Sequence, residues 1–83
     1  MATTAMQKRL SGKVVRVSEG SGPGSNKTFT VCDLNERAEY LVRLEYEERD
    51  YYSMNLLRER GWIAVKDDKG RFDCFPINRL TVV

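Results

Sequence analysis

The residues that most often do chemistry in proteins are sparse in this chain. It has no histidine, so the usual general base, metal ligand and triad partner are all missing. The two cysteines, Cys32 and Cys74, form no C-x-x-C pair, so a structural zinc site would need two carboxylate ligands as well. The composition therefore indicates a protein that is not an enzyme and that binds neither a cofactor nor a metal ion.

Two further patterns resemble reactive sites, but neither meets the chemical requirements. The adjacent carboxylates Glu47-Glu48 and Asp67-Asp68 fall before a predicted helix and in a predicted turn, where acidic side chains usually only solvate the surface. The glycine-rich run 20–26 precedes Lys27-Thr28, as in a phosphate loop. Such a loop needs a glycine directly before its lysine and a helix after it, whereas here an asparagine precedes and a predicted strand follows.

The charged residues are better candidates for binding. The 83 residues include 14 Lys and Arg and 12 Asp and Glu, a net charge of +2. Residues 1–16 hold four basic and no acidic side chains, whereas residues 33–50 hold seven acids against three arginines. Phosphates bind concentrated positive charge, so the candidate nucleic-acid contacts are Lys8, Arg9, Lys13 and Arg16. The acidic stretch 36–50 would repel nucleic acid and suits a basic protein partner.

These side chains must be positioned by a small number of elements. Residues 1–7 are small, polar and aperiodic, so they are interpreted as a flexible N-terminal tail, and residues 8–83 as a single domain. β-Branching at 14–17 and alternation at 27–33 predict strands, joined by a mobile hairpin connection at 20–26. Alternation at 39–46 predicts a third strand, with one face made of Tyr40, Val42, Leu44 and Tyr46.

The period then changes from two to that of a helix. Tyr51, Met54 and Leu57 recur at helical spacing, and Asp50 precedes them as an N-cap. Gly61 stands where a C-terminal glycine ends a helix. The pattern predicts a single helix at about 50–60.

The strongest local signal is a β-hairpin formed by residues 62–66 and 71–75 around a glycine-containing turn. Centring this turn on Asp68-Lys69 places Trp62 opposite Phe75 on one face of the hairpin. Exposed aromatic residues beside charged ones are typical of binding hot spots. The predicted partner-binding surface is therefore Trp62, Asp73, Phe75, Pro76 and Arg79. The alternative is that Trp62 and Phe75 pack under the predicted helix.

The predicted elements make a mainly β protein with one helix. Short antiparallel strands often close into a barrel, which removes exposed edges. The prediction is a small antiparallel barrel of five or six strands, either SH3-like or, as the alternative, an OB-fold, which also places a helix between its third and fourth strands.

Residues 61–83 resemble the end of SH3-like domains. The features in common are Trp62 at the start of the hairpin, a polar turn ending in Gly70, the pair Phe75-Pro76, Asn78 two residues on, and an apolar last strand. The resemblance covers 23 of the 83 residues and implies an SH3-like small barrel. Arg79 stands where signalling SH3 domains carry a ligand-stacking tyrosine, so it does not imply the usual binding of proline-rich peptides.

The predicted function is a non-enzymatic interaction module that binds a protein partner, for instance as a small regulator or accessory subunit. The alternative is a small barrel that binds single-stranded DNA or RNA through the basic N-terminal segment. An enzyme assembled from several copies is a third possibility. Because no apolar segment resembles a signal peptide or membrane span, we expect a cytoplasmic protein with reduced thiols and no membrane partner, either a monomer or a small homo-oligomer.

Overall fold

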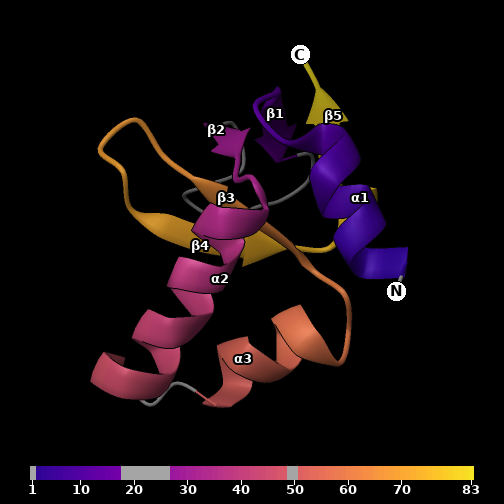
Figure 1. Cartoon of the computed structure of the whole chain (residues 1–83). Helices are drawn as coiled ribbons and strands as arrows, with labels where there is room; N and C mark the ends of the chain where they lie inside the picture. The colour runs from indigo at the N-terminus through magenta and orange to yellow at the C-terminus, as the bar shows by residue number, and fades with distance from the viewer. Residues whose placement is uncertain (1, 18–26, 49–50) are drawn as a thin grey trace.

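The part of the chain that the structure describes folds into one five-stranded antiparallel sheet with three α-helices packed against it (Figure 1). The computed structural model describes residues 2–17, 27–48 and 51–83, so the predicted connection at 20–26 lies outside the described residues. Along the chain the elements are α1 (Ala2–Leu10), β1 (Val14–Val17), β2 (Thr28–Val31), α2 (Leu34–Arg43), the π-helical turn η1 (Leu44–Glu48), α3 (Tyr51–Arg58), β3 (Ile63–Lys66), β4 (Phe72–Phe75), the 3₁₀ turn η2 (Ile77–Arg79) and β5 (Leu80–Val82).

The strands lie in the order β4-β3-β2-β1-β5, and every neighbouring pair is antiparallel. This confirms the predicted antiparallel sheet. Among the described residues β4 and β5 are its two edges and do not pair with each other, so the sheet is not closed into the expected barrel. The expected count of one helix is wrong, because α1 and α2 form where a tail and a strand were predicted.

The sheet nevertheless curls strongly. A flat five-stranded sheet would hold its edge strands roughly 19 Å apart, because neighbouring strands lie about 4.8 Å apart. Residues 76–79 alone connect β4 to β5, and three of them form the 3₁₀ turn η2. Five residue steps reach about 17 Å at full extension, and less through a turn that rises only about 2 Å per residue. The edges must therefore approach each other where β4 ends and β5 begins.

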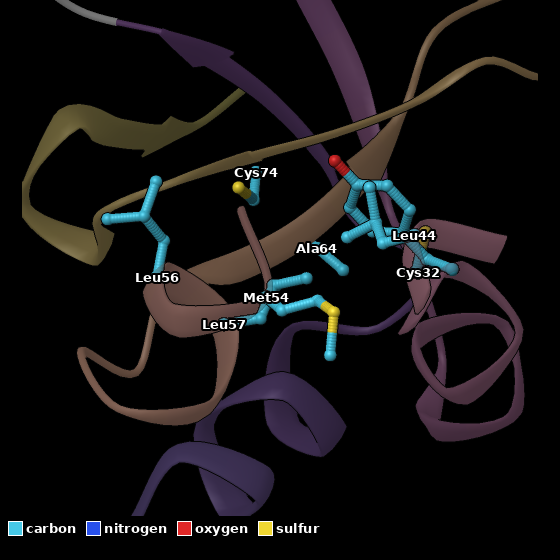
Figure 2. Packing of buried hydrophobic residues seen from close by; sticks show 8 residues of the cluster. Cys32, Leu44, Met54, Leu56, Leu57, Ala64 and Cys74 are labelled. Atoms are coloured by element: carbon cyan, nitrogen blue, oxygen red, sulfur yellow. The ribbon is translucent and has the colours of Figure 1, made fainter. Parts of the chain in front are cut away.

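Two hydrophobic clusters lie on opposite faces of the sheet. The strand cluster contains residues of all five strands: Val15, Val17, Phe29, Val31, Ile63 and Val65, with Phe75 and Leu80 packed against it. The helix cluster lies between β3, β4 and the helices α2 and α3: Cys32, Tyr40, Leu44, Met54, Leu56, Leu57, Ala64 and Cys74. Figure 2 shows Ala64 and Cys74 of the sheet facing Met54 and Leu57 of α3. A layer of helices thus covers one face of the sheet.

Residues 39–46 form the end of α2 and the start of η1, not the predicted strand. The alternation that predicts a strand also fits a helix, because Arg37, Tyr40 and Leu44 recur at helical spacing and are buried. A capping box at the start of α2 decides between the two. The Asp33 side chain accepts from the Glu36 N–H at 2.7 Å, and the Glu36 side chain accepts from the Asp33 N–H at 2.9 Å.

Residues 2–10 form helix α1, so the expectation of a flexible tail is wrong as well. Met6 and Leu10 pack against the strand cluster, while Gln7 between them is fully buried. Two apolar residues four positions apart in a polar segment indicate a helix only weakly. Their burial depends on the curled sheet that the rest of the chain supplies.

Candidate protein-binding surface

The hairpin that carries most of the predicted surface has a register one residue away from the expected one. Gly70 has φ +80°, and the Asp67 N–H donates to Arg71 O at 3.0 Å, so the loop contains three residues rather than two. Such a loop is a type I turn followed by a left-handed glycine. One extra residue moves every side chain of β4 to the other face. Phe75 consequently pairs with Ile63, and not with Trp62.

The five residues of the predicted partner surface are therefore split between the two faces. Trp62 packs against the helix cluster, whereas Phe75 packs in the strand cluster with its ring centroid 5.3 Å from that of Phe29. The Arg79 guanidinium lies over the Phe75 ring at 5.8 Å, and partly buried Pro76 leads into η2. The prediction that these residues form one surface is wrong.

Asp73 makes a contact within its own strand. Its Oδ1 accepts the backbone N–H of Cys74 at 2.8 Å, and burial raises the pKa of the carboxyl. A carboxylate on an edge strand discourages pairing with another chain. Asp73 thus protects the β4 edge, and this contact explains its position without a partner.

Trp62 lies at a hollow beside α3. Tyr52, Asn55, Leu56, Glu59, Arg60 and Trp62 line this half-open hollow of about 450 Å³, which we call the α3 hollow. The Trp62 backbone is fixed on both sides. Its N–H donates to Leu56 O at 2.9 Å, and its carbonyl accepts from Arg37 at 2.8 Å. Gly61, with φ +72°, turns the chain out of the helix and makes the first contact possible.

Three tyrosines near the corner between α2 and α3 project into solvent. Tyr46, Tyr51 and Tyr52 are 83%, 63% and 74% exposed. Tyr46 is not among the predicted site residues, because the alternation at 39–46 placed it on one face of a predicted strand with Tyr40, Val42 and Leu44. A helical reading of the segment, which the Asp33–Glu36 capping box supports, would have placed Tyr46 and Val42 outside.

The four candidate nucleic-acid contacts are all exposed, but they belong to different parts of the molecule. Lys8 and Arg9 lie on α1, which packs on the strand-cluster face through Met6 and Leu10. Arg16 alternates with the buried residues Val15 and Val17 of β1, so it faces the opposite side of the sheet. The four side chains therefore do not form one patch.

A buried amide that the sequence analysis did not single out joins three parts of the chain. Gln7 of α1 inserts its side chain beside β2 and β3, where it uses all of its hydrogen-bonding capacity. Its Nε2 donates to Cys32 O at 2.6 Å and to Ala64 O at 2.9 Å. Its Oε1 accepts from the Ala64 N–H and from Arg37, both at 2.9 Å. The side-chain amide thus takes the place of a peptide group between the strands.

Arg37 completes this network from α2. It is 6% exposed, and its guanidinium also donates to Leu57 O near the C-terminal end of α3. A cation is favoured at this end of a helix, where carbonyl groups lack partners. Burial lowers the pKa of Arg37, although a guanidinium stays protonated in proteins. Arg37 therefore acts as a structural link between α1, α2, α3 and the start of β3.

The thiols are placed for packing and not for chemistry. Cys32 and Cys74 are buried and form no disulfide. The Cys32 N–H donates to Ala64 O, and Ala64 pairs with Cys74, so Ala64 lies between the two cysteines and their Cα atoms are about 9–10 Å apart, too far for a disulfide. Burial raises the pKa of Cys32 to about 12, so the reactive thiolate is scarce at neutral pH.

Other classes of site find little support in the part of the chain that the structure describes. No group of three or more Cys, Asp or Glu side chains in residues 2–17, 27–48 and 51–83 could hold a metal ion. Within the same ranges, every helix is too short or too polar to cross a bilayer. Comparison with protein-family models, curated proteins and solved structures finds no significant match to this chain.

Proposed function

We propose that this protein is a non-enzymatic protein-recognition module whose α3 hollow takes an apolar side chain of a protein partner. The observation that carries the proposal is Trp62, held rigidly at its backbone, in a half-open hollow with exposed Tyr52 at its margin. Tryptophan and tyrosine dominate binding hot spots because they bury a large area at a small entropic cost. A small regulator or accessory subunit in the cytoplasm is consistent with this role.

The charges beside the hollow favour a protein over a nucleic acid. Glu59 and Arg60 both line it, so its margin carries both signs and no concentrated positive charge. The four basic residues of the N-terminal segment lie on other elements and do not converge on Trp62 or Tyr52. A nucleic-acid site would need aromatic rings and basic residues in one groove.

A displayed random-peptide library selected on the folded protein tests this proposal. Selected peptides are then synthesised, and their binding is measured by isothermal titration calorimetry. We expect peptides with a large apolar residue, and we expect Tyr52→Ala to weaken them about tenfold. The matched control is Tyr46→Ala, which removes an equally exposed tyrosine outside the hollow and should leave binding within about twofold.

Three outcomes would contradict the proposal. These are a library that yields no binding peptide, peptides equally affected by both substitutions, and peptides that respond to Tyr46→Ala alone. The nucleic-acid alternative is measured in parallel by fluorescence anisotropy with labelled single- and double-stranded DNA and RNA at low salt. Binding at or below about 100 µM that Arg16→Glu or Lys8→Glu abolishes would replace the protein partner with a nucleic acid.

We also propose that the sheet is an open form of the SH3-like arrangement. The support is the order of its last elements, a hairpin followed by one 3₁₀ turn and a final strand. The strand cluster, with residues of all five strands, resembles a barrel interior. Nuclear Overhauser contacts between Phe75 on β4 and Leu80 on β5 are expected if the two edges curl together. Their absence would favour an open sheet of another type.

A further inference from the structure

Helix α2 carries a ridge of apolar side chains on its outer surface. Leu34, Ala38 and Val42 stand four residues apart, and Tyr46 follows after four more in η1. All four are exposed, Val42 at 61% and Tyr46 at 83%. The inner side of α2 is already occupied by Arg37, Tyr40 and Leu44. The ridge therefore contributes to neither hydrophobic cluster, and it extends about 18 Å along the helix.

The shape of this ridge suits another helix. Side chains spaced four apart form the ridges that fit between the corresponding ridges of a second helix, at a crossing angle near −50°. Ala38, a small residue within the ridge, allows the two backbones to approach to about 8 Å. The larger side chains of Leu34 and Val42 would pack against the second helix on either side of this close contact.

The charged residues beside the ridge indicate the sign of the charge that a partner would carry there. Segment 33–48 contains six acidic residues and two arginines. Arg37 points inward and is buried, so it adds nothing to the outer surface. Arg43 is engaged with Glu39 at 2.9 Å, with both side chains half exposed. Glu36 is likewise paired with Lys66, so among the described side chains beside the ridge Asp33 and Glu45 supply the unbalanced negative charge.

We infer that the outer ridge of α2 docks an amphipathic helix of a protein partner whose apolar face is bordered by Lys and Arg. This inference rests on the proposed role in protein recognition, but it concerns a different surface and a different element of the partner. A basic border complements Asp33 and Glu45, and an apolar face covers Val42 and Tyr46.

Model peptides of defined pattern test this inference on the intact chain. The first probe is a peptide of about 18 residues made of leucine and lysine, with its leucines on one helical face. The second replaces every lysine by glutamate. Amide shifts in NMR spectra should map the leucine–lysine peptide to α2, with an affinity in roughly the micromolar range. The glutamate peptide should bind at least about tenfold more weakly.

A matched pair of variants separates ridge contact from general charge attraction. Val42→Lys and Val83→Lys change the net charge equally, and the two valines are similarly exposed, at 61% and 67%. Val42→Lys should weaken the leucine–lysine peptide about tenfold or more, and Val83→Lys by less than about twofold. Circular dichroism is expected to show that both variants remain folded, because both valines are exposed.

Four results would overturn the inference. They are no binding up to about 100 µM, equal binding of both peptides, shifts located away from α2, and equal effects of the two lysine variants. Concentration-dependent self-association that Val42→Lys abolishes would assign the ridge to a second copy of this chain instead. Library peptides that still bind through Tyr52 in any of these cases would leave the proposed function intact, so the two failures are distinguishable.

Discussion

At the residue scale, a single glutamine side chain replaces part of the strand pairing. Gln7 satisfies the N–H and carbonyl of Ala64 and the carbonyl of Cys32, and it accepts a hydrogen bond from Arg37. A buried polar network is stable only when every member has its partners. Gln7 and Arg37 therefore depend on each other, and the loss of either leaves buried polar groups unsatisfied.

Gln7→Ala should lower the free energy of unfolding by about 3–5 kcal/mol, because it leaves the Ala64 N–H and part of the Arg37 guanidinium without partners. Urea unfolding followed by circular dichroism measures the change. Lys8→Ala, an exposed substitution in the next position of α1, should stay within about 0.5 kcal/mol. Equal effects of the two substitutions would show that the network is not formed.

The two cysteines give a second prediction at this scale. Because both are buried and the pKa of Cys32 is raised to about 12, neither thiol should react with Ellman's reagent in the native protein at pH 8. In guanidinium chloride two thiols per chain should react at once. Fast native labelling of either cysteine would contradict the burial of the helix cluster.

At the element scale, α2 is fixed at its start by a capping box and tied to the sheet by an ion pair. Glu36 takes part in both, since it accepts from the Asp33 N–H and from the Lys66 ammonium. The hydrogen bond from Lys66, followed by that from Asp33, lowers the pKa of Glu36. The ionised form of Glu36 is thus favoured in the folded protein.

A lowered folded-state pKa makes the stabilisation from Glu36 complete above the ordinary glutamate pKa of about 4.3, and it is lost as the pH falls further. Glu36→Gln should therefore flatten the decrease in stability between about pH 5 and pH 2, since glutamine keeps the capping box but cannot ionise. Thermal unfolding across this range measures the effect. An acid slope that Glu36→Gln leaves unchanged would contradict the role of its ionised carboxylate.

The hairpin and the unpredicted helices α1 and α2 show which elements of this chain can be predicted from its sequence. The hairpin of β3 and β4 follows from β-branched and aromatic runs around a glycine, and α3 lies within the helix expected at 50–60. The hairpin register fails because two- and three-residue loops share the same composition, and only the backbone of Gly70 distinguishes them. The spacing of the apolar residues at 39–46 fits both a strand and a helix, so burial against α3 and the sheet decides which of the two forms.

At the scale of the whole molecule, one sheet separates two hydrophobic clusters. Strand β3 contributes Ala64 to the helix cluster and Ile63 and Val65 to the strand cluster. A change on one face must therefore act on the other through shared strands. We expect the helices and the sheet to unfold together, as small domains usually do.

Trp62, the one tryptophan of the chain, reports on this cooperativity because it packs against the helix cluster. Its fluorescence and the far-ultraviolet circular dichroism should give the same urea midpoint. Val15→Ala, a cavity in the strand cluster, should lower both midpoints equally through a loss of about 2 kcal/mol or more. Two separate midpoints, or a fluorescence midpoint that ignores Val15→Ala, would mean that the helical layer unfolds independently.

The candidate site could be predicted only in part. Trp62 is identifiable as an anchor from composition and position, and it does line the α3 hollow. Its expected neighbours Phe75 and Arg79 lie on the other face of the sheet, because one residue in a turn reverses every later side chain in the strand. Tyr46 is not identifiable as a surface residue until the helical layer is known.

By itself the sequence determined most of the local elements: the five described strands and α3 follow from periodicity and turn residues, whereas α1 and α2 do not, and the lack of histidine follows from composition. Only the tertiary structure decided which side of each element is buried. Short segments carry patterns that fit more than one period or register, and the free energy that selects among them comes from contacts with distant parts of the chain. Gln7 shows this most clearly, because its partners are Cys32, Arg37 and Ala64, and none of them is near it in sequence.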